Sequence, residues 1–119
     1  MGETKGSAGP YEAARHWSWQ RLSALALIPL VWWLVLFAGK VLHAGYAETL
    51  AWLREPMNSL AWLALWAAAL YHAALGCQVV LEDYVSEGPK RTQYIIATRL
   101  AFAVLAALAA GVLGLIHLG

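Results

Sequence analysis

Three long runs without a charged side chain constrain the fold of this chain more than any other feature. They cover residues 22–39, 57–81 and 100–119, and the only histidines inside them are His72 and His117. Each run reaches or exceeds the roughly 18 residues that a helix needs to cross the hydrocarbon core of a bilayer. The sequence therefore predicts an all-α membrane protein with three transmembrane helices.

The composition agrees with this class and excludes several others. Of the 119 residues, 61% are hydrophobic and only 13% are charged, too few charges for a small soluble domain that exposes most of its surface. The single cysteine, Cys77, excludes an internal disulfide, and no C-x-x-C-H run is present for covalent haem attachment. The net charge of +1 gives no indication of nucleic-acid binding.

The apolar runs and the polar stretches between them divide the chain into six segments. We expect a flexible tail over residues 1–10, a bend of the first span at Pro29, and a short interfacial helix around residues 47–53. His43 and His117 are predicted to be solvated. The segments are a cytoplasmic amino-terminal segment (1–21), the first transmembrane helix (22–42), an outer or periplasmic loop (43–56), the second transmembrane helix (57–81), a cytoplasmic loop (82–93) and the third transmembrane helix (94–118).

The distribution of basic residues predicts the orientation. Six of the eight lie at the amino-terminal side or around the second loop, and two lie at the opposite side. Because basic residues concentrate in cytoplasmic loops, the amino terminus and the second loop are expected in the cytoplasm. The first group is Lys5, Arg15, Arg21, Lys90, Arg91 and Arg99, with Arg99 reaching back towards the cytoplasmic side, and the second is Lys40 and Arg54.

His72 is the side chain with the clearest functional signal. A titratable ring inside a span is costly unless it has a partner, so intramembrane histidines mark candidate sites. Three roles remain open for it: a hydrogen bond to a neighbouring helix, proton relay, or ligation of a haem iron. Gly76, one turn away on the same face, would leave room for a flat macrocycle. Since His72 is the only histidine deep in a span, a six-coordinate haem would need its second ligand from another chain.

The end of the second span carries two further candidates. Asp83 follows His72 by eleven residues, which on a helix places it about 20° round and about 16 Å along the axis. Asp83 and Tyr84 could simply be a solvated helix end. Alternatively, the Tyr84 hydroxyl, beside a carboxylate and near Arg21, could hold a quinone carbonyl by a hydrogen bond.

Arg21, at the start of the first span, also has two interpretations. It could set the topology and extend its side chain to the water boundary. Together with Gln20 and Ser23 it could instead point at an anionic or polar ligand near the interface.

Two stretches resemble a known family. Residues 72–85 read HAALGCQVVLEDYV and resemble the second span of the hydrophobic membrane anchor subunits of succinate dehydrogenase. Residues 16–30 read HWSWQRLSALALIPL and resemble the start of the first span of the same family. The resemblance also covers the chain length, the three spans and the cytoplasmic amino terminus.

The resemblance implies a specific function within a heteromeric helix bundle of the bacterial inner membrane. It implies that His72 is one axial ligand of a b-type haem and that the cytochrome b subunit supplies the other. Asp83 and Tyr84 match the ubiquinone site, where the tyrosine hydroxyl donates to a quinone carbonyl. Arg21 matches an arginine near the haem propionates and the quinone pocket. FAD and the iron–sulfur clusters would belong to the partner subunits, a flavoprotein that oxidises succinate and an iron–sulfur protein that conducts the electrons.

Three other functions remain open at this point. They are the anchor of a fumarate reductase, a cofactor-free structural helix-bundle subunit, and a small proton-conducting protein. A proton conductor would need at least two or three relay groups across the spans, and the sequence offers only His72. No nucleophile–base pair, phosphate-binding loop or metal-spacing motif is present, so no catalysis is expected from this chain alone.

Overall fold

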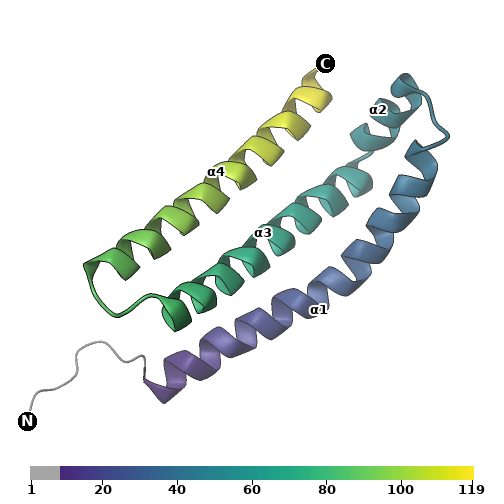
Figure 1. Ribbon diagram of the computed structural model, residues 1–119. Coiled ribbons are helices and arrows are strands. Elements are labelled where there is room, and N and C mark those ends of the chain that lie inside the picture. Colours follow the sequence, from purple (N-terminus) through teal and green to yellow (C-terminus); the bar gives the residue numbers. More distant parts are fainter. Residues whose placement is uncertain (1–8) are drawn as a thin grey trace, which may run out of the picture.

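The computed structural model describes residues 9–119, and four α-helices account for almost all of them. The helices α1 (Pro10–Val41), α3 (Pro56–Tyr84) and α4 (Pro89–Leu118) lie side by side, with α3 between the other two (Figure 1). The short helix α2 (Tyr46–Arg54) lies at the end where α1 connects to α3. No strand forms in the part of the chain that the structure describes, and the three long helices are each long and apolar enough to cross a membrane. The predicted all-α membrane protein with three spans is confirmed.

The helices extend beyond the predicted membrane-spanning segments. α1 begins at Pro10, well before residue 22, because proline suits the first helical turn and Glu12 lies there at the positive end of the helix dipole. α3 continues through Tyr84, so Asp83 and Tyr84 lie in its last turn rather than in a loop. The connection to α4 is correspondingly short. It contains Gly88 at φ 152°, a conformation that only glycine adopts readily. The predicted flexible tail falls almost entirely on residues 1–8, outside the described residues.

Pro29 lies inside α1, and the helix is continuous across it. Figure 1 shows that α1 curves along its length instead of forming a straight rod. A proline removes one backbone hydrogen bond and favours bending at the preceding turn. α1 therefore follows α3 over a long distance, and this brings residues near both of its ends into contact with α3.

An aromatic cluster holds the end of the molecule that carries α2. Phe37 of α1 stacks on Trp52 of α2 with ring centroids 4.5 Å apart, and Trp33 of α1 stacks on the same ring at 5.6 Å. Trp62 of α3 meets Trp33 edge to face at 5.8 Å. Aromatic pairs in these geometries contribute about 0.5–1.5 kcal/mol beyond their buried area. The expected short helix is present, and its indole ring packs on the two α1 rings that also meet Trp62 of α3.

Polar contacts at the same end join α2, α3 and α4. The buried Ser59 hydroxyl donates to the carbonyl of Leu53 at 2.6 Å and lies 2.6 Å from Nε2 of His117. Arg54 Nε donates to the carbonyl of Ile116 at 2.8 Å. The prediction that His117 is solvated is therefore wrong for one of its nitrogens: the residue is exposed overall, but Nε2 pairs with a buried serine on α3.

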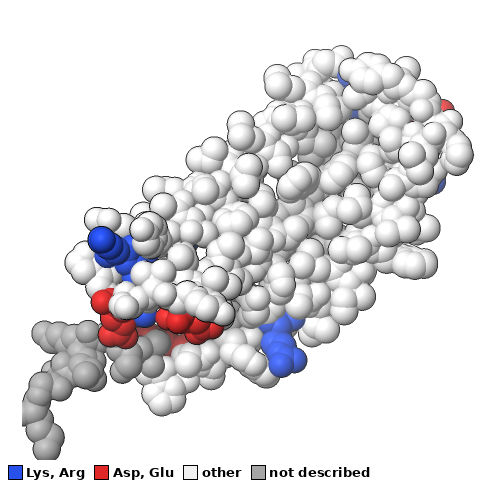
Figure 2. All heavy atoms as spheres, in the orientation of Figure 1, with Lys and Arg blue, Asp and Glu red and all other residues white. Residues whose placement is uncertain are grey.

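Charged side chains gather near the two ends of the body, and the broad band between them is uncharged (Figure 2). One ion pair forms among the described residues, between Arg91 and Glu87 at 3.5 Å in the connection and first turn of α4. This distribution matches three helices that cross a bilayer with their polar ends in water.

We expect the connection between α3 and α4 to face the cytoplasm and the connection between α1 and α2 to face the opposite side. In a Cys77→Ala background, a membrane-impermeant maleimide should label Ser86→Cys only in inverted vesicles and His43→Cys only in intact cells. The basis is the excess of basic residues on one side. The reverse labelling pattern would show that the orientation is inverted.

Candidate functional site

His72 lies on the side of α3 that faces α1, where it meets Ser23. Nδ1 of His72 is 3.0 Å from Oγ of Ser23, a residue 49 positions earlier in the chain. The Ser23 hydroxyl donates to the carbonyl of Gln20 at 2.8 Å, and Ser23 is only 7% exposed. The hydrogen bond to a neighbouring helix that the sequence allowed is therefore present. It uses one of the two ring nitrogens, and Nε2 makes no hydrogen bond with any described residue, so this role does not exclude metal ligation.

Gly76 lies one turn further along α3, where the Gln20 side chain of α1 is its neighbour. A Cβ atom built on Gly76 would lie 4.0 Å from Nε2 of Gln20. The space beside this glycine is thus bordered by the Gln20 amide in the structure. The role of Gly76 in making room for a macrocycle stays a prediction, and the position of the Gln20 side chain decides how much room there is.

The face of α1 that meets α3 carries two buried polar atoms without a partner. They are Nε2 of His16 and Oε1 of Gln20, and neither forms a hydrogen bond within residues 9–119. His16, Gln20 and Ser23 are spaced by four and three residues, which places them on one face of a helix. An unpaired buried polar group costs about 1–3 kcal/mol, so further polar groups belong beside this face. The sequence interpretation did not single out His16, although the four-and-three spacing could have identified it.

A groove borders Ser23, the partner of His72, and it is lined by both small and aromatic side chains. It has a volume of about 460 Å³, and it runs between α1 and α3. Ala68, one turn before His72, is part of its wall. The lining residues are Trp19, Leu22, Ser23, Ala26, Ala67, Ala68 and Tyr71.

His72 keeps one ring nitrogen that could act as a donor to the predicted haem. A haem iron takes one axial ligand from each side, and one imidazole nitrogen with a hydrogen-bonded second nitrogen is a suitable donor. The groove beside Ser23 has alanine side chains on both helices, and Trp19 and Tyr71 also line it. Residues 9–119 contain no cluster of three or more histidine, cysteine or acidic side chains, the arrangement that would indicate a protein-only metal site.

Arg21 lies on a different face of α1 from Ser23. The two residues are separated by roughly 200° round the helix but by only about 3 Å along its axis. The Arg21 side chain is exposed, and its guanidinium lies 4.7 Å from the centroid of the Trp17 ring. Among the described residues, no hydrogen bond or ion pair joins Arg21 to Asp83 or Tyr84. Because Ser23 contacts His72, Arg21 lies close to the level of His72 along the helix axes. Tyr84 lies twelve residues further along α3, far from that level.

Asp83 and Tyr84 end α3 and project from the chain. Tyr84 is 86% exposed, and Asp83 is also exposed. Neither side chain forms a hydrogen bond with the described residues, so both can contact another molecule. They provide a donor and an acceptor side by side, but they do not line a pocket formed by residues 9–119.

Neighbouring polar side chains join α3 to α4 at the same end of the molecule. Arg99 of α4 donates to Oε1 of Gln78 at 2.8 Å, and the Gln78 amide donates to Glu82 at 2.9 Å. The Arg99 side chain was predicted to extend towards the cytoplasmic side, and in the structure it donates to a glutamine of α3. Glu82 is engaged in this contact, which leaves Asp83 as the uncommitted carboxylate of the pair.

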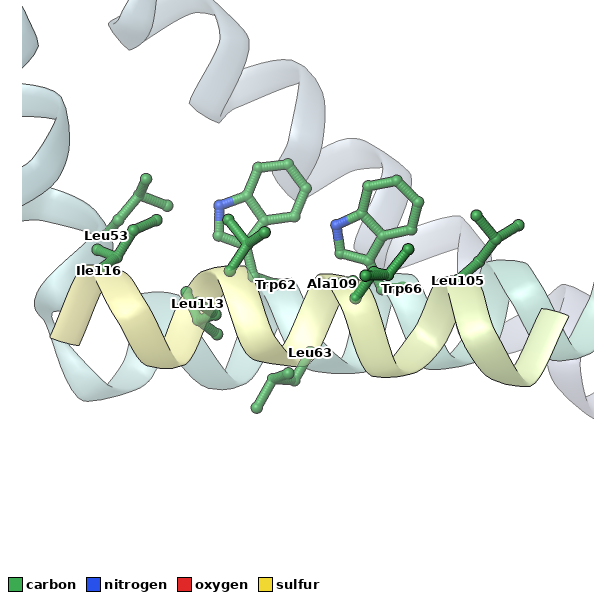
Figure 3. A pocket seen from close by; sticks show the side chains of 10 residues that line it. Leu53, Trp62, Leu63, Trp66, Leu105, Ala109, Leu113 and Ile116 are labelled. Carbon is green, nitrogen blue, oxygen red and sulfur yellow. The ribbon is translucent and has the colours of Figure 1, made fainter. Parts of the chain in front are cut away.

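A second groove, of about 430 Å³, lies between α3 and α4 near α2 (Figure 3). Figure 3 shows leucine, isoleucine, alanine and two indole side chains around it, and it contains no ionisable group. Such a lining is typical of a helix surface that faces lipid or another apolar helix, and we assign it no chemistry. The lining residues are Leu53, Trp62, Leu63, Trp66, Leu105, Leu108, Ala109, Val112, Leu113 and Ile116.

Comparison with known proteins identifies similar chains. Residues 4–114 match the family described as succinate dehydrogenase/fumarate reductase transmembrane subunit. The succinate dehydrogenase hydrophobic membrane anchor subunit of Rickettsia bellii is 33% identical over 103 residues, which cover 87% of this chain and 82% of that protein. The corresponding protein of Rickettsia conorii is 32% identical over 99 residues, with 82% and 79% covered. No solved structure matches the chain.

Proposed function

Because the chain belongs to the succinate dehydrogenase/fumarate reductase transmembrane subunit family, we propose that it anchors a succinate:ubiquinone oxidoreductase in the bacterial inner membrane. The match over residues 4–114 is the observation that carries this proposal. A flavoprotein subunit with FAD would oxidise succinate, and an iron–sulfur subunit would pass the electrons to the membrane. This chain would form the membrane site with the cytochrome b subunit, and its amino terminus would face the cytoplasm.

In this proposal His72 is one axial ligand of a b-type haem, and the cytochrome b subunit provides the other. The haem supplies one-electron redox chemistry when it is bound. The Nε2 atom of His72, which makes no hydrogen bond within residues 9–119, supports the assignment. Since Arg21 lies close to His72 in depth, we assign it to the haem propionates in preference to the quinone, and its side chain would leave the Trp17 ring to reach them.

The proposed quinone contacts are Tyr84 and Asp83. The Tyr84 hydroxyl would donate to a ubiquinone carbonyl, where negative charge develops as the quinone is reduced. Asp83 offers a carboxylate one residue away, and it can hold the tyrosine or accept a proton. Their exposure at the end of α3 supports a site that partner subunits complete.

Replacing His72 by glutamine should remove the proposed ligand and abolish or strongly change the b-haem absorbance of the purified complex. His43→Gln is the matched control, because His43 is an exposed histidine outside the long helices. The measurement is the reduced-minus-oxidised spectrum, together with the haem content for each assembled complex. A His72→Gln complex with the parental spectrum would exclude His72 as the ligand. A parental complex without b-haem absorbance would favour the structural alternative in which this chain binds no cofactor.

Replacing Tyr84 by phenylalanine should slow quinone reduction by about twofold to tenfold, the effect of losing one hydrogen bond worth about 1 kcal/mol. Oxidation of succinate with an artificial dye acceptor should stay near the parental rate, because that reaction does not use the quinone site. Tyr94→Phe serves as the control, since Tyr94 is exposed on α4. An equal loss of both activities would contradict the quinone assignment.

A fumarate reductase anchor is the second candidate, because the family description includes both enzymes. The names of the similar Rickettsia proteins favour the succinate dehydrogenase. We therefore expect the complex to turn over faster with succinate and a ubiquinone than with fumarate and a low-potential quinol. Steady-state rates measured in both directions decide the point, and a faster fumarate reduction would favour the second candidate.

A further inference from the structure

We propose that Ser23 is a positioning residue for His72: its hydroxyl holds the imidazole in the tautomer that carries its proton on Nδ1, which leaves the Nε2 lone pair for the iron. The inference rests on the proposed function, in which His72 ligates the haem. It adds a residue on a different helix to the site and assigns that residue a defined chemical role.

The positions of the oxygen atoms determine where the hydroxyl proton lies. Ser23 Oγ is 2.8 Å from the carbonyl oxygen of Gln20, and a carbonyl has no proton to give. Two oxygens at this distance attract each other only if the Ser23 hydroxyl donates to the carbonyl. The serine has a single proton, so its remaining lone pairs can only accept.

The tautomer of His72 follows from this assignment. Nδ1 lies 3.0 Å from Ser23 Oγ, a good hydrogen-bond distance, and the contact requires a proton that the serine cannot provide. Nδ1 must therefore carry it. In the neutral ring the other nitrogen, Nε2, is then unprotonated. This is the state in which an imidazole binds a metal through Nε2.

The contact is also well placed to fix the direction of the ring. Ser23 is 7% exposed, so water competes little for its hydroxyl. Its own proton is directed at the backbone of α1, which restrains the Oγ position through a 2.8 Å bond to the carbonyl of Gln20. A rigid acceptor restrains rotation of the imidazole, and such outer partners orient metal-binding histidines and raise their basicity.

A second serine on α1 provides an internal comparison. Ser18 Oγ donates to the carbonyl of Ala14 at 2.8 Å, the same kind of backbone contact that Ser23 makes. Ser18 is exposed, and within residues 9–119 its hydroxyl forms no hydrogen bond with a histidine. The backbone bond alone is therefore common to both serines, and only Ser23 adds the bond to an imidazole. Ser18→Ala consequently separates an effect on α1 from an effect on His72.

The test compares Ser23→Ala, Ser23→Thr and Ser18→Ala in the whole assembled complex. Ser23→Ala should raise the midpoint potential of the b-type haem, because the imidazole becomes a weaker donor and stabilises the ferric iron less. It should also change the low-spin electron paramagnetic resonance signal and lower haem affinity on the order of tenfold. Ser23→Thr keeps the hydroxyl and should restore both the potential and the signal. Ser18→Ala should leave both unchanged.

Unaltered potential and resonance signal in Ser23→Ala would overturn the inference. A Ser23→Thr variant as strongly shifted as Ser23→Ala would also overturn it, because packing and not the hydroxyl would then be responsible. His72→Gln separates this failure from a failure of the proposed function. If His72→Gln removes the haem signal while Ser23→Ala changes nothing, the ligand assignment stands and only the role of Ser23 is wrong. An unchanged spectrum in His72→Gln would overturn both.

Discussion

A polar group inside a bilayer has no water to bond, so it must find its partner within protein or ligand, and this constraint organises the chain. Two serine–histidine contacts satisfy it on α3, one near the middle of the helix and one near its first residues. Ser23 and His72 join α1 to α3, and Ser59 and His117 join α3 to α4. Each serine donates to a main-chain carbonyl and presents its oxygen to an imidazole. The central position of α3 is thus established by two specific contacts, in addition to apolar packing.

The same constraint identifies polar groups that find no partner within residues 9–119. Nε2 of His16 and Oε1 of Gln20 are buried without partners in residues 9–119, and Tyr84 is almost fully exposed at the end of α3. Unpaired groups destabilise the isolated chain, and any molecule that pairs with them stabilises the folded state by mass action. A subunit of a larger assembly has this property. The relatives from Rickettsia are named as subunits, and the chain belongs to their family.

The parts of the structure that depend on local sequence could be predicted. The three spans follow from the length of the apolar runs, and the short helix near residue 50 follows from its flanking glycine and proline. The extension of α1 back to Pro10 and the pairing of His117 were missed. The direction of Arg21 and the partner of His72 depend on how α1 is rotated against α3. Helices that are apolar on nearly every face carry little information about that rotation, so hydropathy could not supply it.

The polar line along α1 and α3 also bears on the proton-conducting alternative. From His72 towards the end that carries Asp83, the contact between α1 and α3 includes Ser23, Gln20 and His16. Towards the other end, the buried Leu65 and the aromatic rings around Trp33 and Trp62 replace the polar groups. A conductor needs relay groups across the full thickness of the membrane, and here they are interrupted between His72 and the Ser59–His117 contact. The geometry of residues 9–119 therefore disfavours transmembrane proton conduction by this chain alone.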